Sequence, residues 1–177
     1  MLYIYSYHFI FFIMRLVGAR MTLTLTCRKA NEQDIDTLYD IIQGYAEQGI
    51  MLPRSKETLA AQLDTFVVAE VDGRLVGCGS NTRLGPDLVE IRSLGVTAGY
   101  KGLGIGKSIV NKLVEEARAQ GIPKIMALTY EVAFFERNGF TVVQKEIFPE
   151  KVWRDCIHCK KTALLRRNRR AQTAGLT

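Results

Sequence analysis

Apolar and polar positions in the first third of the chain change from alternation to helical spacing. Thr22–Arg28 alternates threonine with leucine and cysteine, which predicts a strand with one buried face. After Asn31, a residue suited to capping, apolar side chains recur at helical spacing as far as Gly49, which predicts an amphipathic helix. A second, shorter helix is expected after Pro53, with Ser55 as its cap.

The middle of the chain predicts a hairpin, a further strand and a long helix. Thr65–Glu70 and Leu75–Ser80 are expected to pair across Asp72-Gly73, a dipeptide typical of tight turns. Leu88–Val96 predicts the next strand. Gly104–Gln120 predicts a helix whose apolar side chains lie on one side.

Three shorter elements follow the long helix. Lys124–Thr129 is typical of a buried strand, Glu131–Asn138 of a short helix, and Phe140–Val143 of another strand. The predicted order is therefore β, α, α, β, β, β, α, β, α, β. Because strands flank helices in the second half, we expect an α/β fold in a single domain, with a mixed sheet that is flanked by helices and parallel around the long helix.

Length and charge divide the chain into three parts. At 177 residues, 47% of them apolar, it is long enough for one domain with its own core. The net charge of +6 comes from the ends, since residues 160–177 hold six basic residues and no acidic one, whereas residues 21–159 hold 16 basic against 18 acidic residues. We expect an extension over residues 1–20, a domain over residues 21–159 and a basic tail over residues 160–177.

Residues 1–20 are apolar and aromatic, and three interpretations compete. The run is short for a membrane-spanning helix and contains His8. It also lacks the basic start of a secretory signal. The favoured interpretation is that translation begins at Met21 and that the preceding residues are an upstream artefact or a disordered extension, so no membrane partner is expected.

Three glycines, at 102, 104 and 106, lie between the strand at residues 88–96 and the long helix. Such a loop lets the backbone approach a ligand, and the helix directs unpaired N–H groups toward it, so a phosphate is expected. The pattern GxxxxGK[ST] would need glycine at Lys101, and GxGxxG would need it at Lys107. What fits is [Q/R]xxGx[G/A] with Lys101 in first place; the simpler alternative is a glycine-rich turn.

With this loop the chain resembles the GCN5-related N-acetyltransferases (GNAT), in which a loop of this type holds the pyrophosphate of acetyl-CoA. A second segment, Phe134-Phe135-Glu136-Arg137-Asn138-Gly139-Phe140, is similar to the FYxxxGF segment of the family. The resemblance implies the GNAT fold and acetyl-CoA as co-substrate. It assigns acetyl-CoA binding to Leu94, Gly95, Val96, Lys101, Gly102, Leu103, Gly104, Ile105, Gly106, Lys107 and Phe134.

Further segments resemble the short, single-domain N-acetylglutamate synthases. They are Gly49-Ile50-Met51-Leu52-Pro53-Arg54-Ser55, Leu128-Thr129-Tyr130 followed by Phe134-Phe135, and Lys151-Val152-Trp153-Arg154-Asp155-Cys156. The resemblance covers about residues 27–159. It implies acetyl transfer to the α-amine of glutamate or a close relative, a step of arginine biosynthesis in the cytoplasm.

Three groups are candidates for the chemistry of amine acetylation. The attacking amine must be neutral, and Glu90 is expected at a strand end open toward the glycine loop, where it could accept the proton through a water. A backbone N–H near Gly95 or Val96 would stabilise the oxyanion, and Arg54 offers a planar fork for a substrate carboxylate. The alternatives are a solvated strand-end glutamate at Glu90 and a surface arginine at Arg54.

The group that protonates the leaving thiolate is less clearly indicated. Many family members use a tyrosine where this chain has Phe135. Tyr130 is the candidate here, with Thr129 as its alternative. Unassisted departure is also open, since a thiol of pKa about 8.5 is a tolerable leaving group.

The four cysteines do not form a disulfide framework, so a reducing compartment is expected. Cys27 and Cys78 fall in strand patterns and are expected to be buried. Cys156 and Cys159 are interpreted as a structural or vestigial pair, because two thiolates and at most His158 cannot close a tetrahedral zinc site. No metal is expected.

Two rival functions are kept. One is an acetyl-CoA-dependent enzyme for a protein or polyamine, and the other, from a different class, is a nucleic-acid-binding protein that uses the arginine-rich tail. The slightly acidic domain argues against the second, so the expected partners are an amino acid and acetyl-CoA, with no nucleic acid. A homodimer is left open.

Overall fold

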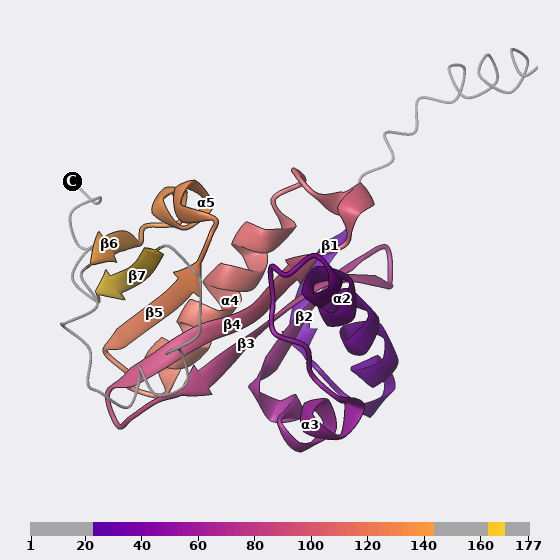
Figure 1. Cartoon of the computed structure of the whole chain (residues 1–177), viewed down its shortest axis with the longest axis horizontal. Helices are drawn as coiled ribbons and strands as arrows, with labels where there is room; N and C mark the ends of the chain where they lie inside the picture. Colours follow the sequence, from indigo (N-terminus) through magenta and orange to yellow (C-terminus); the bar gives the residue numbers. More distant parts are fainter. Residues whose placement is uncertain (1–22, 144–162, 169–177) are drawn as a thin grey trace, which may run out of the picture.

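The computed structural model describes residues 23–143 and 163–168, which build a seven-stranded sheet with helices on both faces (Figure 1). The strands follow the order β1-β2-β3-β4-β5-β7-β6 across the sheet. Their bounds are β1 Leu25–Lys29, β2 Phe66–Val71, β3 Arg74–Arg83, β4 Leu88–Val96, β5 Lys124–Thr129, β6 Thr141–Val143 and β7 Ala163–Asn168. The α-helices are α2 Ile35–Glu47, α3 Lys56–Ala61, α4 Ile105–Ala119 and α5 Val132–Arg137, and the 3-10 turns are η1 Glu32–Asp34, η2 Leu63–Thr65 and η3 Ala98–Tyr100.

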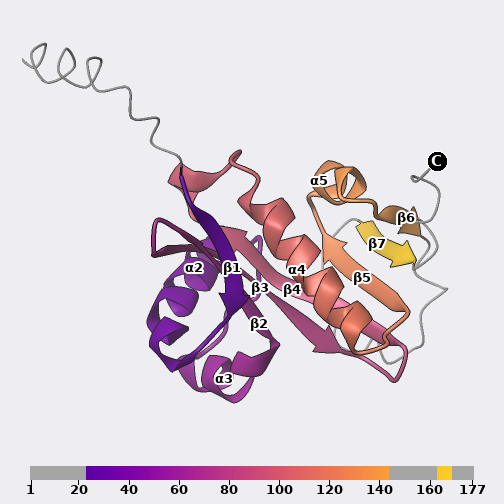
Figure 2. The same ribbon diagram turned by 180° about the vertical axis from the view of Figure 1, so that it is seen from behind.

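The mixed sheet that the sequence predicts is confirmed. Strands β1 to β4 pair antiparallel with one another, whereas β5 runs parallel to β4. A parallel pair needs a long connection, and α4 supplies it while lying across one face of the sheet (Figure 2). The last two strands are antiparallel, since β7 pairs with both β5 and β6.

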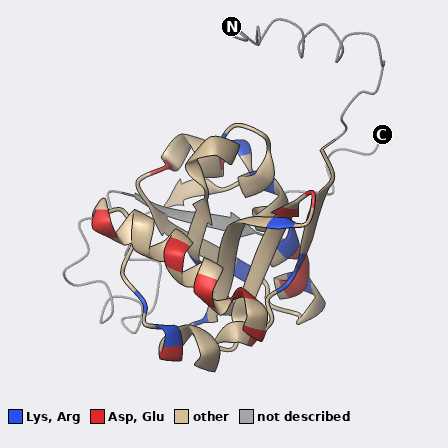
Figure 3. Ribbon diagram, turned by 90° about the vertical axis from the view of Figure 1, so that its right-hand side faces the viewer, with Lys and Arg blue, Asp and Glu red and all other residues tan. Residues whose placement is uncertain are grey.

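Alternating side chains of β2 serve the two layers of the core. Val67 and Ala69 pack with α4, for example with Ile109, and Phe66 and Val68 pack with α2 and α3 on the opposite face. Because both faces of this inner strand are covered, its first four residues are all apolar and buried. Around this core, acidic and basic residues are interspersed on the side shown in Figure 3.

The predicted helix starts are confirmed, with one difference. Asn31 accepts a hydrogen bond from the N–H of Gln33 at 2.9 Å, and Asp34 Oδ2 accepts one from the N–H of Asn31 at 2.8 Å. This capping box encloses η1, so the α-helix itself begins only at Ile35. Ser55 caps α3 through the N–H of Thr58, as expected.

The arginine-rich end of the chain differs from its prediction. Residues 163–168, assigned to a basic tail, form β7, which lies in the sheet between β5 and β6. The segment opens with Ala163-Leu164-Leu165 and pairs with β5 from Thr129↔Ala163 to Lys124↔Asn168. Pairing on both edges outweighs its charge, so the expected domain boundary at residue 159 precedes the last described strand. Residues 1–20 and the Cys156/Cys159 pair lie outside the described residues.

A β-bulge in β4 separates this strand from β5. The register with β3 passes from Cys78↔Gly95 to Ser80↔Arg92, so two residues of β4, Ser93 and Leu94, face Gly79 alone. Ser93 has a φ of 52°, an uncommon value for a residue with a side chain. Pairing with β5 already ends at Ile91↔Ala127, and the rest of β4 therefore has an edge that β5 does not cover.

Gly79 is predicted to be a packing requirement of this bulge. A Cβ at this position would lie 2.9 Å from Ile109 Cγ2 and 3.0 Å from Leu113 Cδ1 of α4. We expect Gly79→Ala to lower the free energy of unfolding by about 1–3 kcal/mol, measured by denaturant unfolding. Gly44→Ala is the matched control, because a Cβ there meets nothing within 4 Å and should stabilise α2 by about 0.5–1 kcal/mol. Equal effects of the two variants would contradict the packing argument.

Candidate active site

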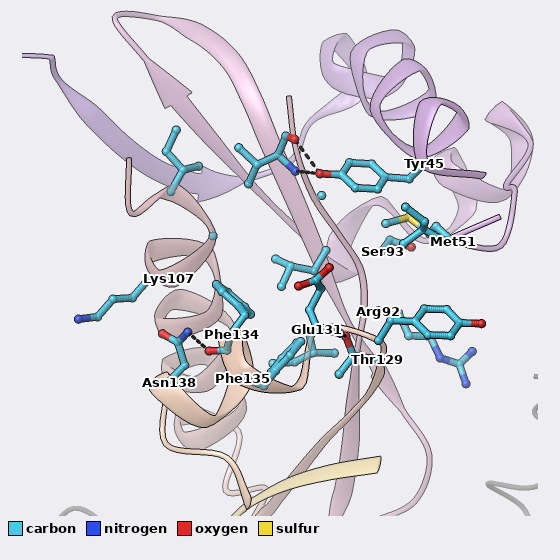
Figure 4. Close-up of a pocket in the computed structure, with 18 of the residues that line it drawn as sticks. Tyr45, Met51, Arg92, Ser93, Lys107, Thr129, Glu131, Phe134, Phe135 and Asn138 are labelled. Carbon is cyan, nitrogen blue, oxygen red and sulfur yellow. Dashed lines mark hydrogen bonds between the residues drawn. The ribbon is translucent and has the colours of Figure 1, made fainter. Parts of the chain in front are cut away.

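A cavity of about 1240 Å³ opens where β4 and β5 separate. One end, the loop end, is bordered by the glycine loop at Lys101–Lys107 and by Phe134 of α5. The other, the α3 end, is bordered by Met51, Arg54, Glu90, Arg92 and Ser93. In Figure 4, Phe134 of the loop end and Met51 and Ser93 of the α3 end lie around one space, whereas the side chain of Lys107 points away from it.

Nearly all the side chains predicted for this site line the cavity. Of the residues assigned to acetyl-CoA binding, only Leu103, whose side chain is 52% exposed, is not a lining residue. Glu90, Tyr130 and Arg54 line the cavity as well. The structure thus brings into one cavity positions that lie as far apart in sequence as Arg54 and Phe134.

The loop end is built as an anion site by α4 and the turn before it. Gly104 is the N-cap residue and has a φ of 80°, a conformation that glycine adopts without strain. The first N–H groups of a helix lack intrahelical acceptors, and residues 104–107 of this first turn line the cavity. Lys101 and Lys107 also line this end of the cavity and add positive charge to it.

Gly106 allows α5 to lie against the start of α4. A Cβ at this position would be 3.2 and 3.3 Å from two ring carbons of Phe134. Phe134 in turn packs edge-on against Phe135, with ring centroids 5.2 Å apart. The segment recognised as similar to FYxxxGF therefore forms a wall of the loop end. Asn138 holds the end of α5 by donating from Nδ2 to the carbonyl of Phe134 at 2.7 Å (Figure 4).

The free edge of β4 between the two ends is occupied by a tyrosine from α2. The hydroxyl of Tyr45 donates to the carbonyl of Val96 at 2.8 Å and accepts from its N–H at 3.2 Å (Figure 4). The N–H of Gly95 faces β3 instead, beside the sulfur of Cys78. The N–H groups of both Gly95 and Val96, expected to be available for an oxyanion, are thus engaged. The carbonyl of Ser93 accepts from Sγ of Cys78 on β3 at 3.4 Å, so the N–H of Leu94, in the same trans peptide, points to the opposite edge.

Glu90 lies deeper in the sheet than the sequence predicts. Rather than ending a strand, it pairs with Met126 of β5 and Thr82 of β3, one residue before the last parallel pair. Its side chain is buried, and Nε of Arg92 donates to its Oε2 at 2.5 Å. The carboxylate therefore sits at the base of the opening between β4 and β5, so the solvated strand-end alternative is wrong.

Arg54 is held near Glu90 by contacts on its own side of the cavity. Its Nη1 donates to Gln62 Oε1 at 2.6 Å, and its guanidinium lies 5.8 Å from the centroid of the Phe66 ring. Burial, with repulsion from Arg92, lowers the pKa of Arg54, and attraction to Glu90 opposes this. Arg54 lines the same cavity as Glu90 and Arg92, so it belongs to the site.

The two groups suggested for proton donation occupy the end of β5. Tyr130 is 41% exposed at the cavity mouth, where a phenol can exchange protons with solvent. Thr129 Oγ1 accepts a hydrogen bond from the N–H of Glu131 at 2.9 Å. Burial raises the pKa of the Cys78 thiol to about 12, so Cys78, although close to the site, stays protonated and is no nucleophile.

Three site residues were not found from the sequence. Tyr45 fits the apolar period of α2 and gave no signal of its hydroxyl contact. Arg92 could have been found, because it lies two residues from Glu90 and therefore on the same strand face. Ser93, 8% exposed, would alternate to the α4 face in a regular strand, and only the bulge turns it toward Met51 (Figure 4).

Metal and membrane features were searched within the part of the chain that the structure describes. Over residues 23–143 and 163–168, no three histidine, cysteine or acidic side chains gather in a way that could hold a metal ion. None of the helices in these ranges has the length and apolar character needed to cross a membrane.

The sequences of two relatives match most of this chain. An uncharacterized N-acetyltransferase, CT2212 of Chlorobaculum tepidum, is 38% identical over 137 residues, which cover 77% of this chain and 88% of that protein. An amino-acid acetyltransferase of Mycobacterium tuberculosis is 35% identical over 131 residues, covering 70% and 75% respectively.

Solved structures agree with the sequence relatives. N-acetylglutamate synthase of Neisseria gonorrhoeae, complexed with coenzyme A and N-acetyl-glutamate, superposes with a TM-score of 0.76 at 29% identity. The match covers 82% of this chain but 35% of the Neisseria chain. Rv2747 of M. tuberculosis, in complex with CoA, superposes with a TM-score of 0.71 at 27% identity and covers 81% of this chain and 98% of its own.

The family match extends across both ends of the cavity. The pattern of the acetyltransferase (GNAT) family covers residues 32–140, from the turn before α2 to the end of the segment similar to FYxxxGF. Fold, site and relatives thus agree, and the chain belongs to the acetyltransferase (GNAT) family.

Proposed function

We propose that the protein transfers the acetyl group of acetyl-CoA to the α-amine of L-glutamate. The observation that carries this proposal is the single cavity in which a helix start suited to phosphate, the buried Glu90 and the guanidinium of Arg54 follow one another. The relatives support it, since one is named an amino-acid acetyltransferase and the Neisseria neighbour holds coenzyme A and N-acetyl-glutamate.

The loop end fits the phosphate portion of acetyl-CoA. Backbone N–H groups of residues 104–107 would hold the pyrophosphate, with Lys101 and Lys107 beside it. The cavity exceeds the roughly 300–1,000 Å³ of pockets for drug-sized ligands, so it has room for a long co-substrate together with an acceptor. When bound, acetyl-CoA supplies the acetyl group as an activated thioester.

The α3 end provides the groups that the acceptor needs. Glu90, oriented by Arg92, accepts the proton of the α-ammonium through a water, which leaves a neutral amine to attack. N–H groups on the free edge of β4 stabilise the oxyanion of the attacked carbonyl, and Tyr45 releases the Val96 N–H if that donor is used. As the C–N bond forms and the C–S bond breaks, the nitrogen releases its second proton to water, and Tyr130 gives its proton to the departing sulfur or the thiolate leaves unassisted.

A protein or polyamine acceptor is less compatible with this end of the cavity. Polyamines carry several positive charges, and two guanidinium groups, those of Arg54 and Arg92, border the place where the amine must bind. Like charges repel strongly where water is partly excluded. The deciding experiment is a thiol-release assay with acetyl-CoA over a panel of amino acids, polyamines and peptides. Glutamate should give the highest kcat/KM, and preferred acetylation of a polyamine or peptide would overturn the acceptor assignment.

The first prediction concerns the loop end. Gly106→Val should weaken acetyl-CoA binding at least tenfold in isothermal titration calorimetry, because its Cβ displaces Phe134 and crowds the phosphate N–H groups. Gly99→Val is the control, since a Cβ there meets nothing within 4 Å. A folded Gly106→Val protein with unchanged affinity would remove the loop from the acetyl-CoA site.

The second prediction concerns proton removal. Glu90→Gln should lower kcat about a hundredfold or more at neutral pH and leave acetyl-CoA affinity nearly intact, because the amide cannot accept the proton. The deficit should shrink as pH rises and more free amine is present without help. Glu115→Gln, on the exposed side of α4, is the matched control. A wild-type rate for Glu90→Gln at neutral pH would mean that Glu90 is no base.

The third prediction concerns recognition of the acceptor. Arg54→Ala should raise the KM for glutamate about tenfold to a hundredfold, the effect of losing a charge-assisted pair of about 1.5–3 kcal/mol. Arg54→Lys should restore the KM only in part, because a point charge cannot replace the planar fork. The KM for acetyl-CoA should barely change in either variant. Arg74→Ala, at the exposed β2–β3 turn, serves as control, and unaltered glutamate kinetics in Arg54→Ala would contradict the role.

A further inference from the structure

Two guanidinium groups share the α3 end of the cavity with the buried carboxylate of Glu90. Arg92 comes from β4, and its Nε donates to Glu90 Oε2 at 2.5 Å. Arg54 comes from the segment before α3 and lines the same end of the cavity as Arg92 and Glu90. Both line the cavity, and the side chain of Arg92 is only 26% exposed.

The charges of these three side chains are complementary to those of one kind of acceptor. Neighbouring like charges in a partly buried site cost free energy unless anions lie close by, and Glu90 is one such anion. An amino acid with an acidic side chain carries two carboxylates and one ammonium, which are opposite in sign to the guanidinium groups of Arg54 and Arg92 and to the carboxylate of Glu90. We infer that the two arginines divide the carboxylates of a dicarboxylic acceptor, with Arg92 holding the α-carboxylate and Arg54 the side-chain carboxylate. The inference rests on the proposed function, because it needs an amino-acid acceptor.

Proximity decides which arginine takes which carboxylate. The α-carboxylate and the reacting amine are bonded to the same carbon, so this carboxylate must lie beside the group that receives the amine proton. Arg92 touches that group, Glu90, directly. A guanidinium has five N–H donors, so its bond to Glu90 is compatible with a second acceptor. Arg54, which projects from a different element, is left for the carboxylate at the far end of the acceptor.

The division makes Arg54 the residue that distinguishes glutamate from glutamine. Glutamine keeps the amine and the α-carboxylate but replaces the side-chain carboxylate with a neutral amide, which forms weaker hydrogen bonds with a guanidinium. 4-Aminobutyrate is the complementary probe, because it keeps the amine and the distal carboxylate and lacks the α-carboxylate. Removing either arginine should therefore leave the affinity for one of these two acceptors nearly unchanged.

The test measures binding, which separates recognition from proton transfer. Dissociation constants of glutamate, glutamine and 4-aminobutyrate are determined by calorimetry on the full chain saturated with coenzyme A, for wild type, Arg54→Gln and Arg92→Gln. Arg74→Gln, which removes the same charge at the exposed β2–β3 turn, is the matched control. We expect Arg54→Gln to weaken the binding of glutamate about tenfold to a hundredfold and the binding of glutamine less than about threefold. Arg92→Gln should weaken the binding of glutamate and of glutamine to the same extent, and the binding of 4-aminobutyrate less than about threefold.

Three results would overturn the division. Equal losses for glutamate and 4-aminobutyrate in Arg92→Gln would reduce Arg92 to a positioning residue for Glu90. Equal losses of affinity for glutamate and glutamine in Arg54→Gln would mean that Arg54 does not bind the side-chain carboxylate. If Arg54→Gln spares 4-aminobutyrate and Arg92→Gln spares glutamine, the two roles are exchanged. If Arg54→Gln or Arg92→Gln does not fold, Arg54→Lys and Arg92→Lys keep the charge and are compared in the same way. Thiol release with glutamate in wild type tells the failures apart, since its absence contradicts the proposed function itself.

Discussion

The separation of β4 from β5 is the constraint on which the rest of the site depends. It arises where Ser93 and Leu94 face Gly79 alone, and the close contact of Gly79 with α4 leaves no room for a side chain at that point. Because the strands part after Ile91, one edge of β4 keeps backbone groups that β5 does not take. The same bulge turns Ser93 to the side of Glu90 and Arg92. A local irregularity in hydrogen bonding thus opens the cavity and also selects the side chains that face it.

In the proposed function, the two ends of the cavity would bind negative charge by different chemistry. At the loop end the donors are backbone N–H groups, fixed by the geometry of α4 and independent of residue identity as long as glycine permits the turn. At the α3 end the donors are guanidinium groups on two separate elements, whose spacing depends on how α3 packs over the sheet. The first arrangement suits a ligand portion shared by many enzymes, and the second suits discrimination between similar acceptors.

Much of the fold could be predicted because local patterns and backbone geometry agree. The turn at Asp72-Gly73, the caps at Asn31 and Ser55 and the glycine before α4 each combine a residue preference with a change of hydrophobic period. The site was less predictable where long-range pairing decides. Ser93 changes face only because β4 bulges against β3, and Tyr45 meets Val96 across 51 positions of sequence. Composition gave the wrong prediction for β7, because it does not distinguish arginines in a strand that is paired on both edges from arginines in a tail.

The position of β7 determines when the sheet can be completed. β7 is the last described element in the sequence, yet it lies between β5 and β6, and β6 pairs with it alone among the described strands. On a ribosome, β5 and β6 are therefore synthesised well before the strand that joins them. Until residues 163–168 emerge, β5 presents an unpaired edge on the side away from β4, of the kind that invites pairing with another chain. Completion of the sheet is thus a late, non-local event in the life of the molecule.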